Sequence, residues 1–337
     1  MVAARKAFLW RAAFTVPLFV TTGTGGVVDS QLNEVTTIVQ VDSPAGSSQA
    51  SGFFNNKLGP ADPKIDGPRW RALEKTWLVT NRHVVLSRAR VNLGGQMFNQ
   101  EFLPSVLRFS MRRKVGERLE WEPIALNQAE VVKRAKCHPD SEVDVCVIEV
   151  GDILNERMVE AQKTGAQYFA PGAISKEMFP GGNNKLSVEA GDAVIVAGYP
   201  KGFYDSFNLF PVLKAGVIGS RWGAQFKGKP CFLIDGQMFP GSSGSLVISR
   251  PTNITVDDGK LLTSKDKQFA VLGILSGEWW DESGNREYEI TTSLTMVVKG
   301  AVNTAIVWYG SLIEDIISSG SPPTPVGPLT PKGPPSK

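Results

Sequence analysis

Histidine is the scarcest side chain of this sequence that could move a proton near neutral pH. The chain has two, His83 and His138. His83 lies in the run WLVTNRHVV, directly after an apolar stretch that ends at Thr80 and Asn81. A histidine at the end of a strand is more often a hydrogen-bonded core residue than a catalytic one. It becomes a candidate general base where a nucleophile and a carboxylate lie beside it.

A glycine- and serine-rich segment further along the chain offers a candidate nucleophile. The run FPGSSGSLVIS contains Ser243, with Gly241 two residues before it and Gly244 directly after it. Glycines at these places let the backbone turn sharply and present the hydroxyl. They also leave the amides of Gly241 and Ser243 free to point at one spot, as an oxyanion site requires. Taken alone, a G-S-S-G-S run is most often an ordinary turn.

The third part is an acid, because a neutral imidazole needs a carboxylate to fix its tautomer and to stabilise its charged form. Asp144 opens the run DVCVIEV, directly before an apolar strand, although an aspartate at a strand entry is also a common turn residue. Asp140 and Glu142 are the alternatives. They lie in the polar turn HPDSE with no apolar run directly behind them, and this favours Asp144.

Together the three segments resemble the trypsin-like (chymotrypsin-fold) serine endopeptidases, and among these the bacterial HtrA/Deg-like proteases. The matching runs are TNRHVV around His83, DVCVI from Asp144 and PGSSGS around Ser243. The resemblance covers residues 32–318, and no PDZ domain is expected after them. The usual second glycine after the nucleophile is Ser245 here. Supporting matches are SGFF from residue 51, GDAV from 191, GYP from 198, AGVI from 215 and LID from 233.

The resemblance implies an all-β fold of two antiparallel six-stranded β-barrels, with the active site between them and a C-terminal α-helix. His83 and Asp144 would come from the first barrel and Ser243 from the second. Ser243 would attack the peptide carbonyl, His83 would take and return the proton, and Asp144 would orient the histidine. The amides of Gly241 and Ser243 would hold the oxyanion. The implied function is a serine endopeptidase, a hydrolase that acts on polypeptide substrates through a covalent acyl-enzyme.

Three positions bear on substrate preference. By the resemblance, Gln237 lies at the base of the pocket for the side chain that precedes the cut. An uncharged amide there gives a buried Lys or Arg no ion-pair partner, which disfavours trypsin-like selectivity. The run LSGE, with Ser276 and Glu278, would pair with the substrate backbone as an added strand. Glu278 could meet a basic side chain at the pocket mouth, although a solvated loop acid is the more ordinary interpretation.

Two other functions stay open from the sequence. One is a serine esterase that uses the same triad, and the other is a catalytically silent trypsin-fold module that binds proteins. The nucleophile elbow of α/β-hydrolases comes with alternating strands and helices and with the order Ser, Asp, His. This chain has the order His83, Asp144, Ser243. An esterase of the α/β-hydrolase type is therefore disfavoured.

Short β-type runs separated by Gly, Pro and Asn make up the middle of the chain, which favours a β-sandwich or barrel. These strands would position His83, Asp144 and Ser243. One exception is 300–318, where apolar residues follow the spacing of an amphipathic helix. Polar stretches at about 55–75, 155–186 and 250–267 are expected to be insertions. The expected strands are VTTIVQV (35–41), TWLVT (76–80), VCVIEV (145–150), AVIVAGY (193–199), CFLID (231–235), SLVIS (245–249) and FAVLGIL (269–275).

The composition sets limits on class and partners. The chain has 337 residues, which corresponds to two lobes or one large β-domain at about 150 residues per domain. Its 36 Lys and Arg against 33 Asp and Glu give a net charge of +3, too small an excess to indicate a nucleic-acid partner. Cys137, Cys146 and Cys231 lack the paired spacing of zinc sites, so no metal and no cofactor are expected. Free buried thiols are the expected state, although whether Cys137 or Cys231 approaches Cys146 stays open.

The two ends differ from the middle of the chain. Residues 1–26 carry basic residues and then a short apolar run, as a secretory signal does, but they lack an A-x-A cleavage site. The apolar run is too short for a transmembrane span. The expected division is 1–30, a signal or N-terminal extension, 31–318, the protease domain, and 319–337, a Pro-rich disordered tail. The chain would be periplasmic or secreted if 1–26 is a signal and cytoplasmic otherwise, and its oligomeric state stays open.

Overall fold

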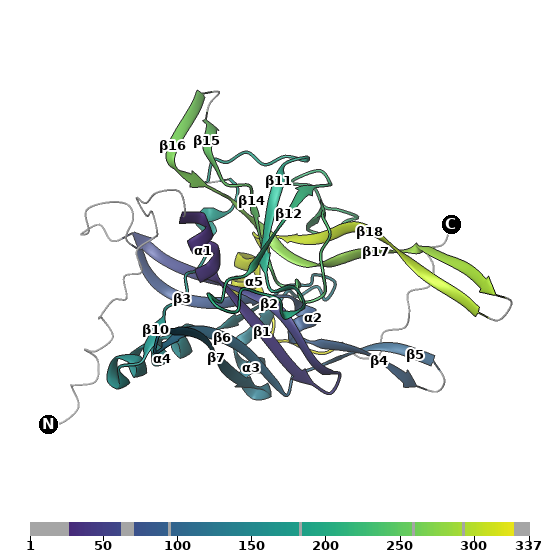
Figure 1. Ribbon diagram of the computed structural model, residues 1–337, viewed down its shortest axis with the longest axis horizontal. Helices are drawn as coiled ribbons and strands as arrows, with labels where there is room; N and C mark the ends of the chain where they lie inside the picture. Colours follow the sequence, from purple (N-terminus) through teal and green to yellow (C-terminus); the bar gives the residue numbers. More distant parts are fainter. Residues whose placement is uncertain are drawn as a thin grey trace.

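Antiparallel β-structure dominates the computed structural model, as the sequence predicts. The strands form an eight-stranded sheet, a closed barrel and two separate two-stranded hairpins. Figure 1 shows the purple and blue sheet strands below the green and yellow strands of the barrel. The described residues are 27–61, 71–93, 96–181, 184–257, 260–291 and 294–326.

The first lobe is the eight-stranded sheet. Its strands are β1 (Thr36–Ser43), β2 (Gly46–Ala61), β3 (Arg71–Thr80), β6 (Val106–Val115), β7 (Arg118–Asn127), β8 (Ala135–Cys137), β9 (Cys146–Glu149) and β10 (Gln167–Phe169). They follow the order β10-β6-β1-β2-β3-β9-β8, and β7 pairs with β6 off this path. β-Branched and aromatic residues, which favour the pleated backbone, recur along them. Val39, Phe54 and Phe109 are among the side chains that fill the core of this lobe, each at most 1% exposed.

The second lobe is a closed barrel of six strands. These are β11 (Ala193–Gly198), β12 (Val212–Ile218), β13 (Cys231–Asp235), β14 (Leu246–Ser249), β17 (Val271–Thr291) and β18 (Leu294–Tyr309). The closed order is β11-β12-β13-β18-β17-β14. Val196, Phe232 and Val307 point into its core. β17 and β18 are much longer than the others and run out of the barrel as a ribbon at the right of Figure 1.

The all-β class, one closed six-stranded barrel and the C-terminal helix are confirmed. The first lobe was also expected to be a closed barrel, and it differs from that expectation. Within the described ranges its strand path runs from β10 to β8 without closing on itself. The sheet instead presents one face to the barrel. Leu246 of the barrel and Phe53 and Val147 of the sheet belong to one buried cluster, so the two lobes share a core.

The helix predicted for 300–318 is shorter than expected. The α-helix α5 spans Leu312–Ser319, while residues 300–309 belong to β18 and pair with β13 and β17. The prediction failed because the apolar residues of 300–309 fit a two-residue period as well as a helical one, and only the barrel partners decide between them. In α5 the apolar side chains Leu312, Ile313, Ile316 and Ile317 are buried in the core between the lobes.

The remaining elements are short helices and hairpins. The expected insertion at 155–186 contains most of α4, all of β10 and η1, and the one at 250–267 forms the β15–β16 hairpin at the top of Figure 1. The described part of 55–75 extends β2 and β3. These elements are α1 (Val27–Val35), α2 (Arg82–Val85), α3 (Gln128–Arg134), α4 (Gly151–Thr164), η1 (Lys176–Met178), η2 (Pro200–Gly202), β4 (Ser87–Leu93), β5 (Gln96–Phe102), β15 (Thr252–Asp257) and β16 (Lys260–Gln268).

The ends of the chain correct one expectation and leave another untested. Residues 1–26, the candidate signal, lie outside the described residues. The tail expected to be disordered from 319 is ordered through Val326, where backbone hydrogen bonds join Ser321 to Cys137 on β8. Among the described residues no helix is long and apolar enough to cross a membrane.

The cysteines also correct an expectation. Cys137 and Cys146 lie directly opposite each other on β8 and β9 and form a disulfide, while Cys231 is a free buried thiol. The sequence does not reveal this pair because nine residues separate the two cysteines and only the hairpin register brings them together. Burial raises the pKa of the Cys231 thiol to about 11, since a thiolate is poorly solvated there.

We expect the thiol count to depend on reduction. Denatured, unreduced protein should take up one alkyl group, at Cys231, and reduced protein three. Reduction should lower the free energy of unfolding by about 2–3 kcal/mol, since the disulfide limits the unfolded chain. Mass spectrometry after iodoacetamide treatment measures the first quantity and urea titration the second. Three alkylated cysteines without reductant would contradict the disulfide.

Candidate active site

His83 is presented by the one-turn helix α2, which follows β3 directly. The carbonyl of Asn81 accepts the amides of Val84 and Val85, and this closes the turn. Val84 and Val85 are buried in the core of the first lobe, which anchors the turn. The side chain of His83 remains 32% exposed at the edge of the lobe.

Asp144 lies just before β9 and contacts His83 at two points. Its Oδ2 is 2.6 Å from Nδ1 of the His83 ring, and its Oδ1 accepts the His83 backbone amide at 2.8 Å. The side-chain amide of Asn81 donates to the Asp144 carbonyl at 2.8 Å, which ties the two loops together. The two alternative acids have other partners. Asp140 accepts the amide of Glu142, and Glu142 pairs with Lys229.

The carboxyl group of Asp144 is held in its charged form. Burial would by itself raise its pKa, but the neighbouring His83 and hydrogen bonds from His83 and Ser276 lower it below the ordinary value of 3.8. The hydroxyl of Ser276 donates to Oδ2 at 2.5 Å. The charge interaction with His83 and the hydrogen bonds to the charged form together outweigh desolvation here.

Ser243 lies in a tight turn that leads into β14. The turn directly before it consists of residues 239–242. A hydrogen bond of 3.0 Å from the Ser242 amide to the Phe239 carbonyl closes this turn. Gly241 has a φ of +87°, which fits the third position of a type II turn after a proline. The hydroxyl of Ser243 donates to the carbonyl of Ser276 at 2.9 Å. Ser276 therefore contacts both Asp144 and Ser243.

Carbonyl contacts orient the peptide groups of this turn. The amide of Lys201 donates to the Pro240 carbonyl at 2.7 Å, and the Ser242 carbonyl accepts the amide of Ser245. In a trans peptide the C=O and N–H point in opposite directions, so the amides of Gly241 and Ser243 face away from these donors. Among the described residues neither amide has a backbone partner. Both are available to a ligand.

Ser51 of β2 was not singled out from the sequence as a site residue, yet it contacts the turn at two points. Its hydroxyl donates to the carbonyl of Gly241 at 3.0 Å, and its amide donates to the carbonyl of Ser243 at 2.8 Å. Asn81 was missed as well. The available signals were the place of Ser51 at the start of the SGFF run and that of Asn81 two residues before the histidine.

The expected specificity residues are only partly described. Gln237 is exposed, whereas its neighbour Met238 is 1% exposed. The place of Gln237 at the base of a substrate pocket stays a prediction. Glu278 lies on β17 opposite Ala305, and its side chain is outside the described residues. Ser276 contacts both Asp144 and Ser243.

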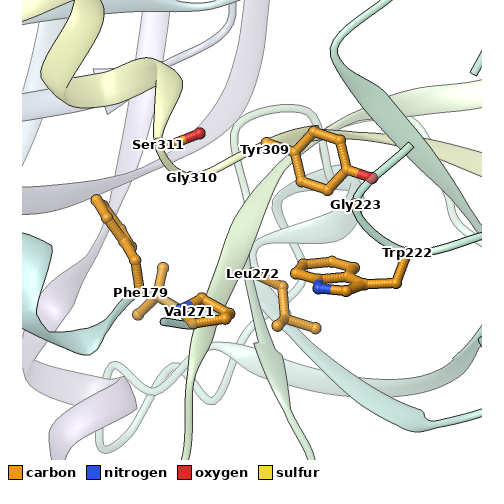
Figure 2. Close-up of a pocket in the computed structure, with 9 residues that line it drawn as sticks. Phe179, Trp222, Gly223, Val271, Leu272, Tyr309, Gly310 and Ser311 are labelled. Atoms are coloured by element: carbon orange, nitrogen blue, oxygen red, sulfur yellow. The ribbon is translucent and has the colours of Figure 1, made fainter. Parts of the chain in front are cut away.

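A separate cavity of about 270 Å³ lies on the second lobe. Figure 2 shows Trp222 and Tyr309 on one side of it and Phe179 on the other. None of the candidate site residues lines this cavity. Tyr309 also packs against Trp222 with ring centroids 5.2 Å apart, so the aromatic wall continues the barrel core.

A family model for the trypsin-like peptidase domain matches residues 50–253. The chain belongs to the trypsin-like peptidase family. The match contains Ser51, His83, Asp144 and Ser243, and β17 with Ser276 lies beyond it. A comparison with curated proteins finds no match.

Solved structures that resemble this peptidase domain include three proteases at low sequence identity. The HtrA-type protease AlgW with a tripeptide is 14% identical, with a TM-score of 0.40 over 86% of this chain and 61% of that chain. A serine endoprotease from Yersinia pestis is 13% identical, with a TM-score of 0.36 over 88% and 67%. The protease Anisep from Arthrobacter nicotinovorans is 10% identical, with a TM-score of 0.39 over 84% and 93%. The chain thus spans less than two thirds of AlgW.

The charged state of Asp144 predicts a contribution to acid unfolding. Its folded pKa lies below 3.8, so its stabilising effect is complete above that pH and is lost as the pH falls through the folded pKa. Asp144→Asn should therefore show a smaller loss of unfolding free energy than the wild type between about pH 5 and pH 2. Urea titrations at several pH values measure this.

Ser276→Ala provides the matched variant for the same experiment. It removes one donor that lowers the pKa of Asp144, so the folded pKa moves toward the ordinary value. The acid loss of stability should therefore be smaller than in the wild type and should end at a higher pH. Identical acid profiles for the wild type, Asp144→Asn and Ser276→Ala would contradict the charged state.

Proposed function

We propose that this chain is a serine endopeptidase that hydrolyses peptide bonds through His83, Asp144 and Ser243 and a covalent acyl-enzyme. The observation that carries the proposal is the hydrogen-bonded path from His83 through Asp144 and Ser276 to Ser243. The amides of Gly241 and Ser243, which have no backbone partner in the part of the chain that the structure describes, support it. Membership of the trypsin-like peptidase family supports the same activity.

The first step is attack by the Ser243 hydroxyl on the peptide carbonyl. With Nδ1 of His83 donating to Asp144, the neutral ring has its acceptor at Nε2, and that nitrogen takes the serine proton. The hydroxyl must first turn from the Ser276 carbonyl toward the imidazole. Catalytic hydrogen bonds often reach their working geometry only with substrate bound.

The amides of Gly241 and Ser243 donate hydrogen bonds to the carbonyl oxygen and stabilise the negative charge that develops on it. Each such donor is worth about 3–4 kcal/mol of transition-state stabilisation where one has been removed. Asp144 stays ionised and stabilises the imidazolium. His83 then gives its proton to the leaving amine, the acyl group remains on Ser243, and a water activated by His83 releases it.

A catalytically silent protein-binding module is the second candidate, and one contact favours it. The hydroxyl of Ser243 donates to Ser276 and not to His83. A serine esterase is the remaining alternative and would use the same acyl transfer. A fluorophosphonate probe separates the silent module from both enzymes, because it labels an activated serine. Peptide and ester substrates then separate the peptidase from the esterase.

We expect Ser243→Ala to abolish peptide cleavage and probe labelling while the protein stays folded, because only a hydroxyl is lost. Asp144→Asn should lower kcat by about 10⁴-fold, since it stabilises the wrong imidazole tautomer. Ser242→Ala is the matched control, because its backbone bond to Phe239 survives and labelling should persist. Activity in Ser243→Ala, or a harmless Asp144→Asn with an inactive Asp140→Asn, would reassign the site.

Substrate preference is expected to favour small or medium uncharged residues before the cut. Gln237 supplies no counter-charge for a basic side chain, and a basic group without a partner is disfavoured. Gln237→Asp should therefore raise kcat/KM for Lys- and Arg-containing peptides, whereas Gln237→Asn should not. A peptide library scored by mass spectrometry measures both. A dominant Arg or Lys before the cut in the wild type would overturn this expectation, and its loss in Glu278→Gln would assign it to Glu278.

A further inference from the structure

The chain does not leave the surface of the first lobe after α5. Ser321 forms a bridge with Cys137, in which the Cys137 amide donates to Ser321 at 2.8 Å and the Ser321 amide donates back at 3.0 Å. Pro323, two residues further, is buried. The segment Ser321–Val326 thus lies against the sheet at the edge formed by β8.

The same segment reaches a buried ion pair at its far end. Arg82 and Glu101 have side chains only 6% and 2% exposed, and Nη2 of Arg82 donates to Oε2 of Glu101 at 3.2 Å. The amide of Val326 donates to that same Oε2 at 3.1 Å. Nη2 of Arg82 also donates to the carbonyl of Thr324 at 2.9 Å. The segment therefore supplies one donor and one acceptor to this pair.

Glu101 depends on all of these neighbours for its charge. Burial would raise its pKa, but the Val326 amide and the guanidinium groups of Arg82 and Arg88 together hold the pKa below its usual range. Arg88 donates to the other carboxylate oxygen, Oε1, at 2.9 Å. Removing one partner of a buried charge pair is costly, because the remaining charge is left without compensation.

The segment is attached close to both halves of the candidate catalytic pair. Arg82 directly precedes His83 in the single turn of α2. Cys137 is joined by the disulfide to Cys146, two residues after Asp144. A displacement of Arg82 would therefore move the backbone of His83, whose own amide bonds Asp144.

We propose that Ser321–Val326 is a strap that fixes the position of α2, and with it the contact between His83 and Asp144. The inference rests on the proposed peptidase function. The residues of the strap are positioning residues, and they act through Arg82 and Glu101. Prolines suit this role, because a chain already restricted to an extended shape loses little further freedom when it binds.

The test compares two shortened chains with the full-length protein. A chain that ends at Gly320 lacks the strap, and a chain that ends at Val326 keeps every bond described above. We expect the first to lower kcat for a peptide substrate by about 10- to 100-fold with KM little changed, as for a misplaced catalytic group. Its acidic pH-rate limb should also shift, because the His83–Asp144 contact is weakened. The Val326-ending chain should match the full-length protein.

A second pair of variants covers the case in which the shorter chain fails to fold. Val326→Pro removes the N–H that donates to Glu101, and Val326→Ala keeps it. Val326→Pro should lower kcat and shift the acidic limb in the same direction, whereas Val326→Ala should do neither. Wild-type kcat and pH profile in the Gly320-ending chain, or in Val326→Pro if that chain does not fold, would overturn the proposal.

A readout that needs no activity separates the strap from the proposed function. The downfield NMR signal of the proton between His83 and Asp144 should persist in the Val326-ending chain and broaden or vanish in the Gly320-ending chain. If no variant, including the full-length protein, cleaves peptides or takes the probe, the proposed function fails while this signal still tests the strap. An unchanged signal in a folded Gly320-ending chain would overturn the strap.

Discussion

The candidate site depends on the contact between Ser51 of the first lobe and the turn around Ser243 of the barrel. His83 and Asp144 belong to the first lobe, whereas Ser243 belongs to the barrel. The three side chains can therefore lie together only if the two lobes are held in a fixed relative position. Ser51 is fully buried, and besides its two bonds to the turn its hydroxyl accepts the amide of Tyr199 and its carbonyl accepts Thr80. Ser51 thereby links β3, the residue that directly follows β11, and the turn around Ser243.

The close approach of the two lobes at Ser51 explains why a glycine is required at position 244. A side chain at Gly244 would collide with the carbonyl of Ser51, and the φ of +82° at Gly244 is one that glycine adopts readily. The glycine after the serine is therefore needed for docking the lobes as much as for presenting the hydroxyl. Ser245, which stands where a second glycine is usual, is buried and donates its amide to Ser242.

The strands could be predicted from the sequence because runs of β-branched residues are local signals. The pair His83 and Asp144 could be predicted because a carboxylate directly before an apolar strand is also a local signal. The failures share a different cause. The strand at 300–309, the Cys137–Cys146 disulfide and the ordered strap all depend on which distant segment lies beside them. Ser51 was missed for the same reason, since its partners Tyr199 and Gly241 are 148 and 190 residues away along the chain.

The turn around Ser243 is held by contacts within the fold itself. Secreted members of the resembled family carry an aspartate directly before the nucleophile, and a newly cut N-terminus neutralises it. Here the position is Ser242, an uncharged side chain that is buried and needs no such partner. Three carbonyls of the turn are instead held by Lys201, Ser51 and Ser245. Because each of these donors belongs to a folded segment of the chain, these three carbonyls are held without any contact from a new chain end.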